Sequence, residues 1–291
     1  MKFYIVDAFT DTLFGGNPAG VVILPEGADF PSDEIMVKTA AELRYSETAF
    51  IRQLGAHEFN IRYFTPAAEV DLCGHATIGS FSALVYTGII EKNCDCINHT
   101  LAGDLNIEIR DGGILMDMAT PVEIDTISDP EKIKELYDIM GAVYDPEKIK
   151  LVPKMISTGL PDIMMPLATQ EDLNAMEPDM KALSDLSARY EVVGVHAFTL
   201  DAEEGVTAHA RNFAPLYDID EEAATGTSNG ALTYYFHLNN IIKPEDHCRI
   251  IQGEKMNRPS VILTSIKATE EECKVKVGGG AVILAEGEIN L

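Results

Sequence analysis

Short apolar stretches recur along most of the chain, and several of them alternate apolar with polar residues. A period of two is typical of strands with one buried face, and these stretches are rich in β-branched and aromatic residues. The strands expected on this basis are KFYIVDAF, AGVVIL, TAFIRQ, FNIRYFT, LNIEIR, ILMDMAT and AVILAEGEI. Because they outnumber the helical segments, strands are expected to form most of the framework.

A longer period of apolar positions predicts helices over residues 33–44, 75–87, 130–141, 178–190 and 227–239. Ser32 precedes the first of them as an N-cap, and Gly88 ends the second. Few strands are separated by a helix long enough for a crossover connection. This order favours an α+β fold with antiparallel or mixed sheets over a doubly wound parallel sheet.

The two halves of the chain resemble each other. Each contains, in order, an Ala-Phe strand, an Arg-x-Phe-x-Pro strand end, an acidic linker, a glycine turn and a segment of small apolar residues. Residues 62–66 align with 211–215, and residues 73–75 align with 225–227. An internal repeat of this kind predicts two pseudo-twofold related halves, each a curled mixed or antiparallel sheet around one central helix.

The boundary between the halves is expected within residues 121–150, which read as a capped helix. The N-terminal half is expected to span residues 1–120, with the closing strands of the chain packed back on it, and the C-terminal half residues 150–291. Gly74 and Gly226 stand where a strand leads into each central helix. The N–H groups that follow have no partner within the helix, so each helix start is expected to bind an anion at an interdomain cleft.

The composition, 46% hydrophobic and 24% charged residues, is typical of a soluble globular protein. The 47 acidic and 22 basic residues give a formal net charge of −25, which repels nucleic acid and anionic membranes. No apolar run approaches the roughly 20 residues of a membrane span, and the first residues read as a strand rather than a signal peptide. The sequence therefore predicts a cytoplasmic protein that binds neither nucleic acid nor membrane. A small anionic metabolite is still expected as its ligand, because the two helix starts can hold an anion locally despite the net charge.

Cysteine and histidine occur together in two places. Cys94, Cys96 and His99 are close in sequence, but the second pair of ligands typical of a structural zinc site is missing, so a loop with reduced thiols is the preferred interpretation. In EVDLCGHATIGS, Cys73 and His75 admit three interpretations: a metal site, a cysteine nucleophile or an ordinary helix start. The five cysteines, without a secretory signal, do not indicate a disulfide framework.

Glycine-rich stretches do not indicate a nucleotide site. GGNPAG and GGG lack the lysine of a phosphate-binding loop, and no GxGxxG motif leads from a strand into a helix. Both stretches read as turns, and Asn17 in the first is a candidate to line the cleft.

Seven motifs, taken together and in order, resemble the phenazine-biosynthesis PhzF-like family. They are VDAFTDTLFGGNPAGVVIL, SETAF, RYFTPAAEVDLCGHATIG, STGLPDIMMPL, RNFAP, EEAATGTSNGAL and QGEKMNRPS, and they cover nearly the whole chain except about residues 121–150. The resemblance implies the diaminopimelate-epimerase-like fold, with two similar α+β halves and the active site between them. It also implies isomerase chemistry without a cofactor, and commonly a homodimer.

The resemblance also implies site residues. The family's catalytic glutamate falls on Glu47, and its Gly-His pair falls on Gly74 and His75. The family's aspartate falls on Glu222, where the carboxylate is one methylene further out, and the family's serine falls on Thr227. One methylene can displace a reacting group by about 1 Å, which matters where catalytic geometry is tight.

These residues lead to one expected function, a cofactor-independent isomerase that shifts a proton on a small unsaturated carboxylate. Glu47 is expected to act as general base and acid, with His75 and Glu222 assisting and orienting. The substrate-binding residues expected are Gly74, Gly226, Thr227 and Asn17, with no metal. The alternatives are a one-base epimerase and a non-catalytic ligand-binding or protein-interaction member of the same fold.

A racemase with two thiols is disfavoured. In related racemases of this fold, one thiol from each half acts on opposite faces of a carbon atom. Here the position that matches Cys73 is Thr225, which cannot act as a thiolate. Cys73 is therefore interpreted as a small buried packing residue.

Overall fold

The structure, a computed structural model, describes residues 1–269 and 271–291. The chain divides into two compact units: unit 1 comprises residues 1–117 and 278–291, and unit 2 comprises residues 118–277. The segment expected to hold the boundary, residues 121–150, lies within unit 2. Its apolar side chains, Ile133 and Tyr137 among them, are buried in a core of that unit, so this segment is part of unit 2 rather than a linker.

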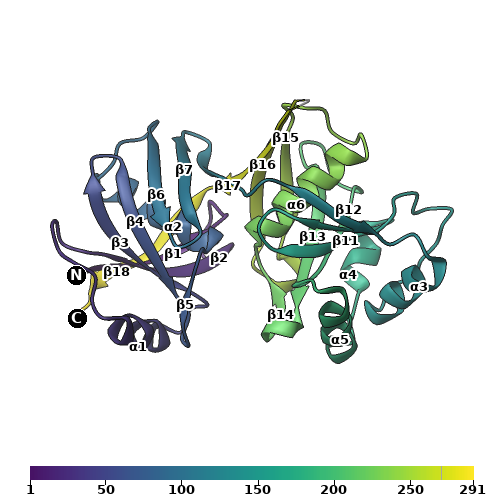
Figure 1. Cartoon of the computed structure of the whole chain (residues 1–291), viewed down its shortest axis with the longest axis horizontal. Coiled ribbons are helices and arrows are strands. Elements are labelled where there is room, and N and C mark those ends of the chain that lie inside the picture. Colours follow the sequence, from purple (N-terminus) through teal and green to yellow (C-terminus); the bar gives the residue numbers. More distant parts are fainter. Residues whose placement is uncertain (270) are drawn as a thin grey trace. The chain divides into compact units, whose positions relative to one another are not determined.

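Unit 1 is built on a mixed sheet (Figure 1). Its strands are β1 (Lys2–Ala8), β2 (Asn17–Ile23), β3 (Thr48–Gly55), β4 (Glu58–Phe64), β5 (Glu69–Val70), β6 (Asp95–Thr100), β7 (Gly103–Arg110), β8 (Gly113–Asp117) and β18 (Ala281–Glu288). β1 pairs antiparallel with β18 and β2, β2 runs parallel to β3, and β3 pairs antiparallel with β4. β4 pairs antiparallel with β5 and parallel with β6, and β7 and β8 follow in antiparallel steps.

The helix α2 (Gly74–Tyr86) lies inside the curl of the unit 1 sheet (Figure 1). Its side chains are buried on several sides, with Ile78 and Phe81 fully enclosed, as expected for a helix that is apolar all round. Gly79 permits a close approach to β1, because a Cβ atom there would lie 3.4 Å from the side chain of Val6. A second helix, α1 (Asp33–Leu43), packs through its apolar side chains on residues of β2, β3 and β4.

Unit 2 repeats this order of strand pairing. Its strands are β9 (Val122–Thr126), β10 (Lys154–Ser157), β11 (Pro161–Leu167), β12 (Gly194–Thr199), β13 (Ala208–Ala214), β14 (Ile219–Glu222), β15 (His247–Gln252), β16 (Ser260–Ala268) and most of β17 (Cys273–Gly279). From β10 to β13 the successive pairings are antiparallel, parallel and antiparallel. β13 also pairs antiparallel with the short β14 and parallel with β15, and β15 pairs antiparallel with β16. The pairings from β1 to β7 follow the same order. The helix α6 (Gly226–Leu238) takes the place of α2.

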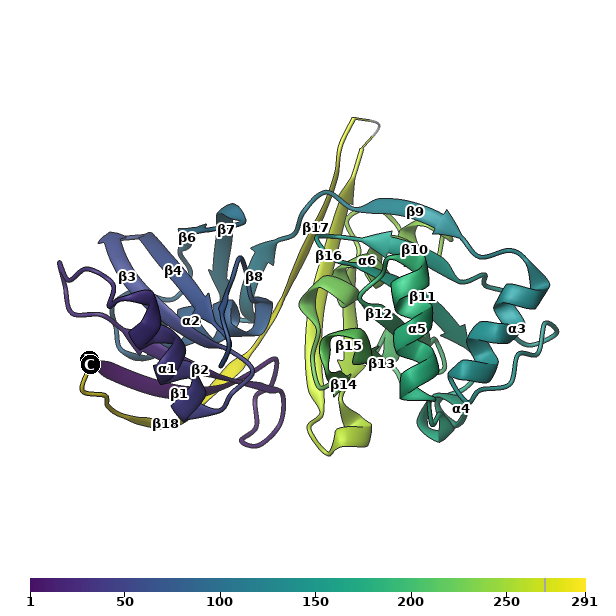
Figure 2. The same cartoon turned by 60° about the horizontal axis from the view of Figure 1, so that its bottom comes forward.

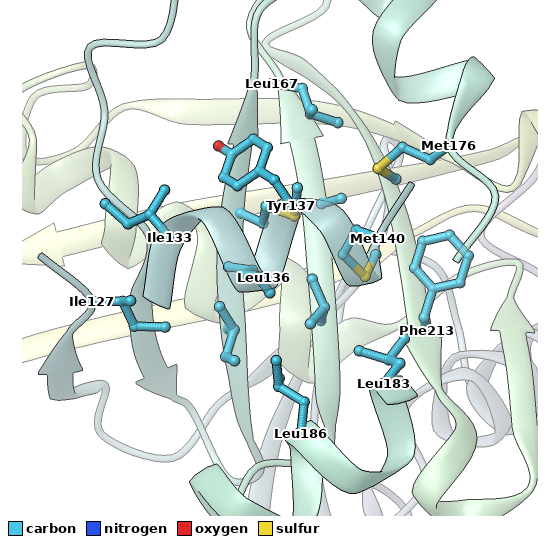
Figure 3. Close-up of a cluster of buried hydrophobic side chains, with 14 of the residues drawn as sticks. Ile127, Ile133, Leu136, Tyr137, Met140, Leu167, Met176, Leu183, Leu186 and Phe213 are labelled. Carbon is cyan, nitrogen blue, oxygen red and sulfur yellow. The ribbon is translucent and has the colours of Figure 1, made fainter. Parts of the chain in front are cut away.

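A layer of helices covers a second face of the unit 2 sheet (Figure 2). It consists of α3 (Pro130–Ile139), α4 (Gln170–Ala175) and α5 (Met180–Tyr190). Leu136 of α3, the C-cap residue Met140 and Leu183 of α5 share one buried cluster with Phe213 of β13 (Figure 3). A separate cluster surrounds α6, so the unit 2 sheet is buried on both faces.

The α+β architecture with mixed sheets is confirmed, and the five helices expected from the sequence are present close to their expected bounds. The helix α4 was not expected, because six residues are too few to show a helical period. Its start is nevertheless marked by Thr169, whose hydroxyl accepts a hydrogen bond from the N–H of Asp172. Within the described residues, no helix has both the length and the apolar character needed to cross a membrane.

Candidate active site

Three titratable side chains meet at the start of α2 in unit 1. Glu47 immediately precedes β3, whereas Cys73 is the N-cap residue of α2 and His75 is its second residue. Cys73 and His75 are buried, with 7% and 5% of their surface exposed, and 20% of the Glu47 side chain is exposed. The cluster is therefore enclosed, and Glu47 is its most accessible member.

The distances within the cluster are short. Glu47 Oε2 lies 3.2 Å from His75 Nε2, and Cys73 Sγ lies 3.4 Å from His75 Nδ1 and 3.8 Å from Nε2. The imidazole also contacts Ser46 Oγ and the Asn17 amide, each at 3.3 Å. Among the described residues, Glu47 Oε2 is a buried oxygen that makes no hydrogen bond, so its contact with His75 is that of an ion pair.

The electrostatics of the cluster favour a charged pair. Burial alone would raise the pKa of Glu47, but His75, Ser46 and Cys73 together hold it below its usual value. Burial would likewise lower the pKa of His75, but Cys73 and Glu47 raise it well above its usual value. Burial, reinforced by the negative charge of Glu47, raises the pKa of Cys73 to about 11. Near neutral pH the cluster therefore holds a carboxylate, an imidazolium and a thiol.

Hydrogen bonds anchor the first turn of α2 to the sheet. The hydroxyl of Thr77 donates to the carbonyl of Cys73, and it is 2.6 Å from the hydroxyl of Tyr63 on β4. Asn98 on β6 donates to the same Tyr63 hydroxyl. Gly74, the first residue of α2, follows an N-cap that makes no side-chain capping bond among the described residues, which leaves the backbone donors of this helix start available to a ligand.

Glu222 lies at the start of α6 in unit 2, at the end of β14. Its Oε2 accepts a hydrogen bond of 2.9 Å from the hydroxyl of Thr225, the N-cap residue of α6. Gln252 on β15 ties the same turn together, because its amide nitrogen donates to the Glu222 carbonyl and to the Thr225 hydroxyl oxygen. Its amide oxygen accepts from the backbone N–H of Thr225.

A chain of buried side chains continues from Gln252 into the core of unit 2. Asn229 on α6 donates to Gln252 Oε1 and to the Thr225 carbonyl, so its own oxygen, 3.3 Å from His196 Nε2, is an acceptor for the imidazole N–H. His196 Nδ1 is then left to accept from Asn212 on β13. Each donor in this chain faces an acceptor. His196 must be neutral for the chain to form, because its Nδ1 can accept a hydrogen bond only when it carries no proton.

The chain ends at a buried acid on β11. Asn212 also donates to Ser228, whose hydroxyl donates to Asp162. Burial lowers the pKa of His196 to about 4, so the imidazole is neutral, and raises the pKa of Asp162 to about 6. Hydrogen bonds thus hold the Glu222 turn, whereas ionisable groups surround Glu47.

Comparison with known proteins identifies the family. The model of the phenazine biosynthesis-like proteins, PhzC-PhzF, matches residues 6–287. The chain belongs to this family.

Its relatives in the family extend over the full chain. An uncharacterized isomerase of Clostridium acetobutylicum is 32% identical over 100% of this chain and 98% of its own. The uncharacterized isomerase YfhB of Bacillus subtilis is also 32% identical, over 95% of this chain and 94% of its own. A crystal structure of a PhzF-family phenazine biosynthesis protein of Bacillus anthracis has a TM-score of 0.86 and 25% identity, and covers 100% of this chain and 99% of that one. These findings place the chain in the PhzF family, beside relatives that are named isomerases.

In this PhzF-family chain, the site residues expected from the sequence fall into two groups. Unit 1 brings together Glu47, His75, Gly74 and Asn17. Unit 2 brings together Glu222, Gly226 and Thr227, the last two being the first residues of α6. That both groups serve one cleft stays a prediction.

Three residues near the two helix starts were given no site role from the sequence. Cys73 was expected to be a small buried residue, and it is buried, but its sulfur also touches the imidazole of His75. Gln252 stands in the QGEKMNRPS motif, which was noted without a role, and His196 gave no signal, since a histidine within a strand is commonplace. Only the strand order places these two beside the start of α6.

The thiols of Cys94, just before β6, and Cys96, on β6, lie 3.9 Å apart and are buried, and neither is in a disulfide. His99 is directed elsewhere, to the partly exposed carboxylates of Glu58 and Asp104. The third residue of the motif therefore does not join the two cysteines.

Proposed function

We propose that this chain is a cofactor-independent isomerase in which the Glu47 carboxylate moves a proton on a small, unsaturated, carboxylate-bearing substrate. Glu47 removes a carbon-bound proton as a base and returns it to another carbon as an acid. Such a step needs one group that is ionised before the reaction and protonated during it. As the family resemblance implies, the protein is expected to act as a homodimer.

The observation that carries this proposal is the contact of Glu47 with His75. The histidine is buried at the start of a helix that is anchored to the sheet, so it holds the carboxylate in one position. Glu47 nevertheless keeps 20% of its side chain exposed, which leaves a route for a substrate. A buried, oriented and still accessible carboxylate suits a single-residue proton shuttle.

The substrate carboxylate is assigned to backbone donors at the helix starts. Gly74 and Gly226 are the first residues of α2 and α6, and among the described residues neither helix has a side-chain cap. Unsatisfied N–H groups and the positive end of the helix dipole favour an anion there, despite the net charge of −25. Glu222, held by Thr225, is assigned an orienting role.

The test uses solvent exchange with defined probes. A panel of hydroxy- and amino-substituted unsaturated carboxylic acids is incubated with the protein in heavy water, and deuterium incorporation and double-bond position are followed by NMR. Exchange with a shifted double bond is the expected result. Exchange at a single carbon with inversion favours the one-base epimerase, and binding without exchange in any probe favours the non-catalytic alternative.

Glu47→Gln keeps the shape of the side chain but removes the base, so exchange should fall by about 100- to 10,000-fold. Glu42→Gln is the matched control, because Glu42 is exposed on α1 and its loss should leave exchange unchanged. If Glu222 orients the same substrate, Glu222→Gln should lower exchange less than Glu47→Gln, and the double variant should fall no further than Glu47→Gln alone. Full activity of Glu47→Gln would overturn the proposal.

A further inference from the structure

The cluster at the start of α2 also has the composition of a metal site. Among the described residues, Glu47, Cys73 and His75 are three side chains of metal-binding type whose donor atoms all lie within 4.8 Å of one another. They come from two segments that are far apart in the sequence, the end of the loop before β3 and the start of α2. A single cysteine or histidine would not indicate a metal site, but a carboxylate, a thiol and an imidazole that lie close together do.

Two of the donor–donor distances are close to those of a tetrahedral site. With zinc–sulfur and zinc–nitrogen bonds of about 2.3 and 2.0–2.1 Å, neighbouring ligand atoms in a tetrahedron lie about 3.3–3.6 Å apart. His75 Nε2 is 3.2 Å from Glu47 Oε2 and 3.8 Å from Cys73 Sγ. All three donor atoms lie within 4.8 Å of one another, so side-chain movements of about 1 Å would bring them to a common ion.

The charges also suit a divalent cation. A bound Glu47 carboxylate and Cys73 thiolate together carry two negative charges, which one divalent ion neutralises within a largely buried site. Binding releases two protons to solvent: the thiol proton of Cys73, and the Nε2 proton of the His75 imidazolium, because a ring nitrogen binds an ion only when it carries no proton. The ion then replaces the imidazolium as the positive charge beside Glu47 Oε2, an oxygen that makes no hydrogen bond among the described residues.

The surroundings of the cluster complete the site. With Nε2 on the metal, His75 Nδ1 is free to donate its proton to the Asn17 side chain, which lies 3.3 Å away and can present its oxygen by rotating its amide. Three protein ligands leave a fourth position for water, as in open zinc sites. The partial exposure of Glu47 supplies a way in for the ion.

We infer that Glu47, Cys73 and His75 form a three-ligand site for a thiophilic divalent cation such as Zn²⁺, and that a bound cation blocks proton transfer by Glu47. The first half of this inference stands on the geometry alone. The second half rests on the proposed function, because an ion bound to the Glu47 carboxylate occupies the lone pair that would take the proton.

The test uses Co²⁺ as the probe on the full-length protein, after treatment with a chelator and under reducing conditions without thiols. We expect one equivalent of Co²⁺ to produce a thiolate-to-cobalt charge-transfer absorption and the visible bands of a tetrahedral ion, both abolished by excess Zn²⁺. Cys73→Ser should lose the charge-transfer band, and Glu47→Gln and His75→Gln should each weaken binding by at least about tenfold. Circular dichroism of each variant establishes that it is folded.

The matched control is the Cys94→Ser/Cys96→Ser double variant, which removes the other close pair of thiols and should keep the band. Loss of the band in this control but not in Cys73→Ser would overturn the inference, as would a wild-type protein that binds no Co²⁺ at a hundred-fold excess of the ion.

Solvent exchange separates this inference from the proposed function. Exchange in the chelated protein that stops with one equivalent of Zn²⁺ and returns with chelator is the expected result. If Co²⁺ binds through Cys73 but the chelated protein exchanges no probe, the metal site stands and the proposed function fails. If exchange occurs only with the metal bound, the cation is an activator and its blocking role is wrong.

Discussion

The starts of α2 and α6 occupy the same place in two units of the same strand order, yet their side chains do different things. In unit 1 the N-cap position holds Cys73, surrounded by ionisable groups. In unit 2 it holds Thr225, whose hydroxyl donates to Glu222 at one end of a chain of hydrogen-bonded side chains. The same backbone arrangement thus supports a cluster that can exchange protons in unit 1, and a turn held by hydrogen bonds of fixed direction in unit 2.

The two candidate carboxylates are not counterparts in the repeat. Glu47 precedes β3, whereas Glu222 ends β14, the counterpart of β5. What the repeat does preserve is an arginine clamp: Arg62 holds Glu69 with two hydrogen bonds, and Arg211 holds Glu221 in the same way. The duplicated frame was kept, while the reactive groups differ between the copies.

The arginine clamps offer the largest expected effect. Arg211 has 7% of its side chain exposed and also donates to the carbonyls of Leu173 and Met176, whereas Arg62 has 21% exposed. Arg211→Met should lower the free energy of unfolding by about 3–5 kcal/mol, because it leaves a nearly buried carboxylate and two carbonyls without a donor. Arg62→Met should cost about 1–2 kcal/mol. Urea unfolding measures both, and equal costs would show that the clamps are equally buried in solution.

The polar chain of unit 2 predicts a pH dependence of stability. The folded pKa of His196, about 4, lies below the usual value of about 6.5, so the unfolded chain takes up a proton first as the pH falls. Stability that is present above pH 6.5 is therefore lost progressively toward pH 4, by up to about 3 kcal/mol. Asp162, with its pKa raised to about 6, acts in the opposite direction, so its share of stability is lost as the pH rises from about 4 to 6.

Single variants separate these two contributions in urea unfolding between pH 4 and 7. His196→Gln should lose less stability on acidification than the parent, and Asp162→Asn should lose more. His57→Gln is the control, since His57 is exposed in a turn of unit 1. An unchanged pH profile in His196→Gln would mean that the imidazole is not held neutral by the chain.

The smallest effect is expected at the N-cap thiol itself. If Glu47 alone moves the proton, Cys73→Ser should lower solvent exchange of a responsive probe by less than about tenfold, because serine keeps a hydrogen-bonding group beside His75. NMR-monitored exchange in heavy water measures this. If Cys73→Ser is inactive and Glu47→Gln is active, the thiol of Cys73 is the base instead. The proposed difference between the two units is then wrong.

Local patterns determined much of this protein. The period-two stretches became strands, the helical periods became α1, α2, α3, α5 and α6, and the aligned residues 62–66 and 211–215 became equivalent strand ends with equivalent clamps. These features follow from residues that are neighbours along one element, where periodicity and turn chemistry act directly. The motif residues Glu47, Gly74 and His75 could be named for the same reason, since the motifs are continuous in the sequence.

Tertiary structure alone decided which distant side chains became partners. Residues 121–150 joined unit 2 because the apolar face of α3 is buried against its sheet. Gln252 and His196 reached the start of α6 through the parallel and antiparallel steps that order β12, β13 and β15. Cys73 changed from a small apolar residue to a partner of His75 and Glu47, because packing brings the loop before β3 against the start of α2. Contacts of this kind depend on the closure of a whole sheet, which no single segment of the sequence encodes.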